Sequence, residues 1–176
     1  IEVELTYIAT ESLTFDISLG YIDSTFDNVI DTNPETGETF DKSDRFTVSN
    51  TPDLTFNFGA TYRLYTDMGD FVFNSNYYHR GEYALFEEDS LLSQDSYSLL
   101  NAGITWYSTD GHWNAGLYAK NLTDEEYMIG GYQFVAPDPS DPQNVSKYTP
   151  GLGGDNTLIG YYGDPRTVSF TVGYRF

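Results

Sequence analysis

The sequence lacks cysteine and is poor in basic residues. Because none of its 176 residues is Cys, a disulfide scaffold and a thiolate metal site are both excluded. Only 8 Lys and Arg oppose 27 Asp and Glu, which gives a formal net charge of −19. So few cations cannot neutralise nucleic-acid phosphates. The same balance argues against docking on an anionic membrane surface.

Long apolar runs and helical periodicity are also absent. No run of 18 apolar residues occurs, which excludes a transmembrane helix, and no basic-then-apolar leader is visible. The mean hydropathy is only −0.43. A transmembrane β-strand, however, is apolar on one face only, and its loops are polar. The low average therefore remains compatible with a membrane barrel.

Aromatic residues are abundant, at 17%, and they fall in segments that alternate with period two. In residues 167–176 the apolar members of the alternation are Val168, Phe170, Val172, Tyr174 and Phe176. Successive side chains of a strand point to opposite faces, so this pattern predicts one apolar and one polar face. Six earlier segments repeat the pattern, and the seven predicted strands are residues 1–7, 13–21, 54–64, 71–83, 97–107, 113–121 and 167–176.

The predicted connections alternate between short and long. Residues 9–12, 65–70 and 108–111 are short connections, the last containing the tight-turn pair Asp110-Gly111. Long connections occupy roughly residues 28–51, 84–96 and 122–164, and they carry many of the acids. Outer-membrane barrels have short periplasmic turns and long extracellular loops. We therefore predict an all-β fold, an antiparallel transmembrane β-barrel segment of about seven long strands.

Seven strands cannot close a single-chain bacterial barrel, because such barrels have even strand numbers and lipid does not tolerate open edges. One hypothesis is that the chain belongs to a larger barrel, and the alternating pattern already present at Ile1 favours it. A second is a small self-contained barrel, porin-like or an adhesin, with an eighth strand in residues 31–51. A third is a soluble carbohydrate-binding β-sandwich, which the polar opposite face of each strand disfavours.

Two segments resemble the end of the TonB-dependent receptor barrel. Residues 120–127, KNLTDEEY, resemble the "NLxDxxY" segment of that family through Asn121, Leu122, Asp124 and Tyr127. Residues 161–167, YYGDPRT, resemble its "GxPRT" segment through Gly163, Pro165, Arg166 and Thr167. Phe176 resembles the terminal aromatic of the family, and residues 49–54 resemble an "N-x-P" strand entry.

The resemblance implies a 22-stranded barrel with a plugged lumen, of which residues 1–176 form the carboxy-terminal portion, without the plug domain. It implies an integral protein of the Gram-negative outer membrane that imports a scarce nutrient. Most members of the family take ferric siderophores, and others take vitamin B12, haem, nickel or saccharides. The implied partners are lipid, the rest of the barrel, the plug, TonB, a small-molecule ligand and the barrel-assembly machinery, which would read the signal ending at Phe176. Neither catalysis nor a cofactor is expected.

Several residues are candidates for binding. Tyr132, Phe134, Tyr148 and Tyr161 lie in one long connection and either form part of a ligand mouth or pack that loop on its neighbours. The acids at 87–89 and at 138 and 141 are either Ca²⁺ ligands or a solvated loop surface. The two histidines, His79 and His112, show no metal-ligand spacing, and His79 has Ser75 near it as a weak lipase-like pair. The polar faces, predicted to line the lumen, carry Glu2, Glu4, Asp16, Asn57, Arg63, Asn74 and Asn76.

Overall fold

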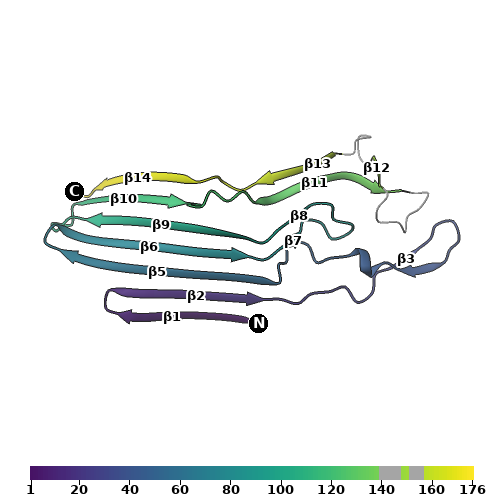
Figure 1. Ribbon diagram of the computed structural model, residues 1–176, viewed down its shortest axis with the longest axis horizontal. Coiled ribbons are helices and arrows are strands. Elements are labelled where there is room, and N and C mark those ends of the chain that lie inside the picture. Colours follow the sequence, from purple (N-terminus) through teal and green to yellow (C-terminus); the bar gives the residue numbers. More distant parts are fainter. Residues whose placement is uncertain (139–147, 151–156) are drawn as a thin grey trace.

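The computed structural model describes residues 1–138, 148–150 and 157–176. Its main feature is one antiparallel seven-stranded sheet in the order β1-β2-β5-β6-β9-β10-β14 (Figure 1). The strands are β1 (Glu2–Thr10), β2 (Leu13–Tyr21), β5 (Leu54–Thr66), β6 (Gly69–Arg80), β9 (Tyr97–Tyr107), β10 (Trp113–Lys120) and β14 (Thr167–Tyr174). All seven strands predicted from the alternation are present, so the predicted fold class is confirmed.

The strand register keeps the apolar and polar side chains on opposite faces throughout the sheet. Phe73 of β6 pairs with Tyr62 of β5 and with Ile104 of β9, and the Phe73 and Tyr62 rings stack with centroids 6.2 Å apart. One position further along β6, Asn74 pairs with Thr61 and accepts a hydrogen bond of 3.2 Å from the Thr61 hydroxyl. One face is therefore a continuous apolar surface, and the other carries polar groups that bond one another.

Tight turns join the strands at one end of the sheet, and the long connections leave from the other end (Figure 1). The turn between β5 and β6 depends on Gly69, whose φ is +117°. A Cβ at Gly69 would lie 2.1 Å from the carbonyl oxygen of Tyr107, so no other residue fits there without a backbone shift. The neighbouring carbonyl of Met68 accepts a hydrogen bond from the Trp106 indole at 2.8 Å. This turn is thereby fixed to the end of β9.

The strand β6 ends at Arg80, three residues earlier than the alternation predicted. Gly81 still donates to the carbonyl of Leu54 at 2.8 Å. Pro52 comes two residues before Leu54 in the sequence and has no N–H group to donate, so the hydrogen-bond ladder between the two strands cannot continue. The chain then forms β7 (Tyr83–Ala84), which pairs with β8 (Ser93–Gln94) in a separate small sheet.

The long connections contain short strands of their own. β3 (Ile30–Thr32) and β4 (Thr39–Asp41) form a two-stranded hairpin, followed by the 3₁₀ turn η1 (Ser43–Arg45). β11 (Met128–Pro137) pairs with β12 (Tyr148–Pro150) and β13 (Thr157–Tyr162) in a sheet that extends beyond the main one (Figure 1). The prediction that residues 122–164 form only a connecting loop was wrong.

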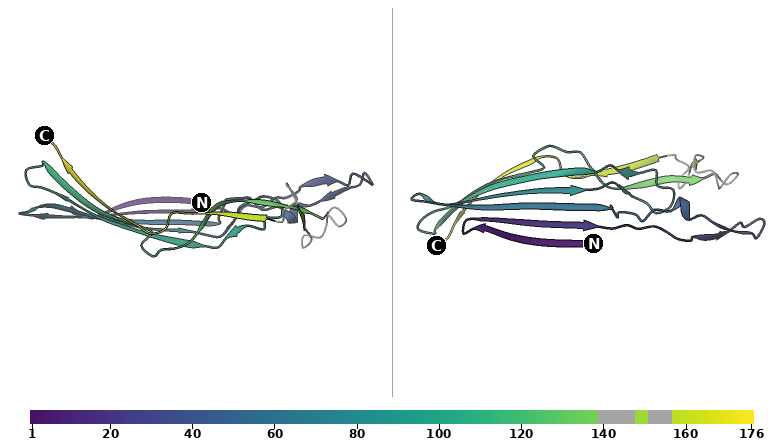
Figure 2. Two further views of the ribbon diagram at one scale, coloured as in Figure 1. Left: turned by 90° about the horizontal axis from the view of Figure 1, so that it is seen from above. Right: turned by 60° about the horizontal axis from the view of Figure 1, so that its bottom comes forward.

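The main sheet is curved and twisted and remains open (Figure 2). β1 and β14 are its two edges in the part of the chain that the structure describes. The β3–β4 hairpin does not join this sheet, so residues 31–51 supply no eighth strand for a self-contained barrel. The seven strands form one layer. The large side chains of the described core are Tyr83, Leu85 and Tyr97, and all three lie at the end from which the long connections leave, which we call the outward end. A two-sheet sandwich is therefore also excluded.

No helix in the described ranges is long and apolar enough to cross a membrane.

Candidate functional site

Asn121 lies where the chain leaves β10, and its side chain organises the connection that begins there. Its Nδ2 donates to the carbonyls of Glu125 at 2.8 Å and Asp164 at 3.2 Å. Its Oδ1 accepts from the backbone N–H of Glu125 at 2.9 Å, while its own N–H donates to Asn101. The residue is 4% exposed and has φ +49°, a conformation that Asn tolerates better than most residues.

The two family-like segments meet at a second contact. The backbone N–H of Arg166 donates to Oδ1 of Asp124 at 2.9 Å, and the two charged groups approach to 3.6 Å. Both side chains are half exposed, so the ion pair itself contributes little stability. The directed bond from the Arg166 backbone still fixes the chain just before β14 begins at Thr167, which pairs with Lys120.

Tyr127 and Gly163 make the third contact. Gly163 donates its backbone N–H to the carbonyl of Tyr127 at 2.8 Å. A Cβ at Gly163 would lie 2.1 Å from Cζ of Tyr127, so only glycine leaves room for the ring. The Tyr127 ring also stacks on Tyr97, with centroids 4.5 Å apart and planes at 16°. Burial raises the pKa of the Tyr127 phenol, which agrees with a ring held inside the structure.

These contacts form one unit, which we name the clasp and define as residues 121–127 and 163–167. The structure brings together all eight predicted motif positions in it, with Leu122 accepting from the Arg166 guanidinium at 3.4 Å and Pro165 in the approach to β14. The clasp closes the base of the connection between β10 and β14. The geometry gives the motif a positioning task; its role in function stays a prediction.

A cluster of aromatic and apolar side chains lies beside the clasp, at the outward end of the sheet. Tyr83, Leu85 and Tyr97 are buried in it, and Tyr127 and Met128 pack against them. The Tyr83 hydroxyl donates to the carbonyl of Met128 at 2.7 Å. The guanidinium of Arg80 stands over the Tyr83 ring, 3.9 Å from its centroid, which is a cation–π geometry. Sequence reasoning missed this cluster, because its members lie in two stretches that are distant in sequence, residues 83–97 and 127–128.

The predicted ligand-mouth residues lie on β11 to β13, in the sheet that extends beyond the main one. The Tyr132 ring stacks with Phe134 and meets Tyr161 edge-on, both at 5.9 Å between centroids, and Tyr132 and Tyr161 are about half exposed. Alternation places Tyr132 and Phe134 on the face of β11 opposite Gln133, and Tyr161 lies on the paired strand β13. The side chain of Tyr148 lies outside the described residues. Three of the four residues thus share one exposed surface, and ligand binding by them stays a prediction.

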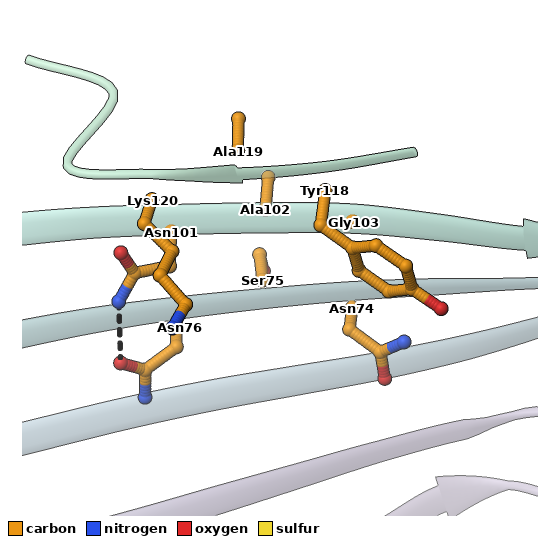
Figure 3. Close-up of a pocket in the computed structure, with 9 residues that line it drawn as sticks. All are labelled: Asn74, Ser75, Asn76, Asn101, Ala102, Gly103, Tyr118, Ala119 and Lys120. Atoms are coloured by element: carbon orange, nitrogen blue, oxygen red, sulfur yellow. Dashed lines mark hydrogen bonds between the residues drawn. The ribbon is translucent and has the colours of Figure 1, made fainter. Parts of the chain in front are cut away.

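A row of polar side chains crosses the inner, polar face of the sheet. The amide of Asn76 donates to Asn57 at 2.5 Å, and that of Asn101 donates to Asn76 at 3.5 Å. Figure 3 shows Asn76 and Asn101 at one side of a cavity of about 320 Å³, with Asn74 and Tyr118 at the other. Tyr118 also bonds to the Thr105 hydroxyl at 2.8 Å. The predicted polar face is therefore a surface of side chains that hydrogen-bond one another across neighbouring strands.

The histidines lie near opposite ends of the main sheet, His79 at the end of β6 and His112 in the turn before β10. Nδ1 of His79 lies 3.0 Å from the hydroxyl of Ser98, which also bonds Tyr77 at 2.9 Å, so its partner is not the expected Ser75. Nδ1 of His112 lies 2.8 Å from the carbonyl of Arg175. Within the part of the chain that is described, no three His, Asp or Glu side chains are grouped to hold a metal ion. Of the acids considered for Ca²⁺, residue 141 lies outside the described residues.

Most of the negative charge lies in the outward segments. Residues 22–53, 81–96 and 121–166 contain 20 of the 27 acidic residues but four of the eight basic ones. Lys42 forms ion pairs with Asp31 at 3.0 Å and Glu88 at 2.9 Å, and Arg45 pairs with Asp89. Two of the acids in the candidate Ca²⁺ segment 87–89 therefore already have cationic partners.

The ion pair between Asp31 and Lys42 stabilises the β3–β4 hairpin fully only within a defined pH range. The hydrogen bond from Lys42 lowers the pKa of Asp31 below its ordinary 3.8, so this stabilisation is complete above 3.8 and is lost as pH falls through the lowered value. Bonds to Glu88 and Asp31 raise the pKa of Lys42 above 10.5, so its contribution is complete below 10.5 and is lost above the raised value. We expect amide exchange of residues 29–41 to speed up at both extremes. The variant Lys42→Met should weaken the acid transition without removing it, because the Thr32 N–H still lowers the pKa of Asp31 and backbone bonds still lower that of Asp41. An unchanged transition would contradict the assignment.

An open antiparallel sheet with one apolar face, one polar face, tight turns at one end and long segments at the other defines a segment of a transmembrane β-barrel. Residues 1–122 match the family model described as TonB dependent receptor-like, beta-barrel. The chain therefore belongs to the TonB-dependent receptor barrel family. Its members are transport receptors of the Gram-negative outer membrane.

Solved structures show the same fold at low sequence identity. The chain superposes on the ferric yersiniabactin uptake receptor FyuA of Yersinia pestis with a TM-score of 0.70 and 17% identity, covering 99% of this chain and 23% of that one. The siderophore receptor PiuA of Acinetobacter baumannii gives 0.66 and 14%, over 98% and 21%. The ferric-catecholate import receptor Fiu of Escherichia coli K12 gives 0.64 and 16%, over 99% and 20%. The chain thus spans about a fifth of the length of the receptors it matches.

Proposed function

We propose that this chain is the carboxy-terminal portion of the barrel of an outer-membrane active-transport receptor that imports a ferric siderophore or a similar iron complex, with energy supplied through TonB. The observation that carries the proposal is the family match over residues 1–122. The superposed proteins are a ferric yersiniabactin uptake receptor, a siderophore receptor and a ferric-catecholate import receptor, which supports iron complexes as the ligand class. The protein acts as a transporter, and catalysis has no part in the proposal.

The proposal assigns a separate partner to each surface of the sheet. The apolar face, which includes Phe73 and Ile104, contacts lipid. The polar face, with its Asn57–Asn76–Asn101 row, contacts the plug domain and lumen water. The edges β1 and β14 pair with the remaining strands of the barrel. The outward end, with the aromatic cluster and the exposed Tyr132 surface, contributes to the ligand mouth.

The last strand is also proposed to carry the signal for the barrel-assembly machinery. Its apolar side chains share the outer face of β14 and are strongly exposed, from 49% at Tyr174 to 105% at Phe176. The Phe176 ring meets Tyr174 edge-on at 5.2 Å between centroids. The signal residues are Val168, Phe170, Val172, Tyr174 and Phe176.

Uptake of radioactive iron tests the function. We expect a strain that lacks the complete receptor to lose ⁵⁵Fe uptake from at least one chelate in a panel of catecholate, hydroxamate and mixed siderophores. The complete gene should restore uptake, and inactivation of TonB should abolish it again. If uptake of every ⁵⁵Fe chelate stays normal while vitamin B12 or nickel uptake is lost, the ligand class is wrong. Uptake that persists without TonB would overturn active transport.

A further inference from the structure

Asp89 occupies an unusual position in the outward segment 81–96. Its carboxylate accepts hydrogen bonds from Nε of Arg45 at 3.0 Å and from Nη2 of the same guanidinium. The side chain of Asp89 is only 5% exposed, and that of Arg45 is 10% exposed. A two-pronged bond between Arg and a carboxylate fixes the relative orientation of the groups as well as their distance. Asp89 therefore holds the segment 22–53, which contains Arg45, against the segment 81–96.

The backbone of Asp89 is used as fully as its side chain. Its N–H donates to the carbonyl of Arg45 at 3.0 Å, and its carbonyl accepts from Nε2 of Gln133 at 3.0 Å. Its φ is +45°, in the left-handed region that residues other than Gly seldom adopt. Backbone strain of this kind persists where the surroundings determine it. Here the strained conformation lets one residue bond to two different segments.

Gln133 completes the link to the third segment. It lies on β11, and besides donating to Asp89 it accepts from the backbone N–H of Leu91 at 2.8 Å through Oε1. Both ends of one amide side chain therefore bind the segment 81–96. Asp89 is the residue at which all three outward segments meet.

Contacts on both sides extend the same association. Thr47 donates its N–H to the carbonyl of Glu87 at 2.8 Å, which pairs the first two segments. Gln94 accepts from the backbone N–H of Met128 at 2.5 Å, which joins the second segment to β11. The Lys42–Glu88 ion pair adds a further link between the first two. The association therefore runs over an extended line of contacts.

We infer that the outward segments 22–53 and 81–96, together with β11, move as one body, and that Asp89 and Gln133 are the positioning residues that join them. Among the described residues, the main buried cluster includes none from segment 22–53, so polar contacts such as these hold that segment to the other two parts. Loss of the Asp89 carboxylate removes both of its bonds to the buried Arg45 guanidinium, which weakens the link between segments 22–53 and 81–96. Without Asp89, we expect the two segments and β11 to become more mobile at the same time.

Hydrogen exchange of the complete receptor in detergent tests this inference without any ligand, so its outcome is independent of the proposed function. In Asp89→Asn, we expect amide exchange to rise at least tenfold in residues 42–50, 85–92 and 128–135 together. Asp44→Asn is the matched control, because Asp44 is an exposed acid one residue from Arg45, and it should leave all three unchanged. Faster exchange confined to 85–92 in Asp89→Asn would overturn the inference.

A milder variant separates coupling from misfolding. Gln133→Met removes both amide bonds without leaving a buried charge, so the receptor should assemble normally. Spin labels at Thr47→Cys and Ile129→Cys, in a background without other cysteines, report the distance between the first segment and β11. We expect a single narrow distance distribution in the parent and a broad one in Gln133→Met and in Asp89→Asn. A distribution that stays narrow in both variants would show that these residues do not join the segments.

Discussion

The variant Asn121→Ala should assemble poorly and lose about 3 to 5 kcal/mol of stability in the clasp. The change removes three hydrogen bonds, those to the carbonyls of Glu125 and Asp164 and that from the N–H of Glu125, each of which contributes about 0.5–1.5 kcal/mol. Alanine also tolerates the φ of +49° poorly, which adds about 1 kcal/mol. The measurements are the fraction of folded receptor in outer membranes and the amide exchange of residues 121–127.

Two further variants divide this effect between its causes. Asn121→Gly keeps the backbone conformation and loses only the hydrogen bonds, so it should be less damaging than Asn121→Ala. Asn121→Asp keeps the acceptor for Glu125 but turns a carboxylate toward the two carbonyls, so it should still impair the clasp. Equal stability of the parent and Asn121→Gly would show that the side-chain bonds contribute nothing.

Phe73→Arg should destabilise the receptor by about 2–4 kcal/mol, the cost of an arginine on the lipid face near the middle of a barrel. Phe73 lies in the middle of β6 on the apolar face, between Tyr62 and Ile104. The neighbouring change Asn74→Arg puts the same charge on the polar face, where water and polar groups surround it. It should cost under about 1 kcal/mol, because Asn74 makes a single side-chain bond with Thr61.

Urea-induced unfolding in lipid vesicles measures the difference between these neighbours. Phe73→Ala serves as the control for loss of the stacked ring, and subtracting its effect leaves the cost of the charge. If Phe73→Arg and Asn74→Arg are equally destabilised, the assignment of the two faces to lipid and lumen is wrong.

The seven strands were predictable because each carries its own local signal. In β5 the residues Phe56, Phe58 and Ala60 alternate with Asn57 and Gly59, and such a pattern fits only a strand with two unlike faces. The end of β6 was not predictable in the same way. It depends on Pro52, which is distant in sequence and lies near Gly81 only after β5 and β6 have paired.

Few local sequence patterns predict how the segments at the outward end are organised. Asp89 stands in a run of three acids whose composition is typical of a solvated loop, yet its side chain is buried against Arg45. The strand β11 begins with Met128-Ile129-Gly130-Gly131, where neighbouring glycines obscure any alternation. The clasp residues were found through family resemblance, but their contacts with one another became visible only in three dimensions.

The two unpaired edges of the main sheet also determine how this chain behaves when it is handled alone. β1 and β14 each present a row of free N–H and C=O groups next to a wide apolar face. In buffer, such edges add strands from further copies, and the product is a fibrillar or amorphous precipitate. In the proposed barrel, the same two rows of backbone groups would pair with the neighbouring strands. If the chain is part of a larger barrel, as proposed, co-expression with the remaining strands is therefore the practical route to a folded sample in detergent.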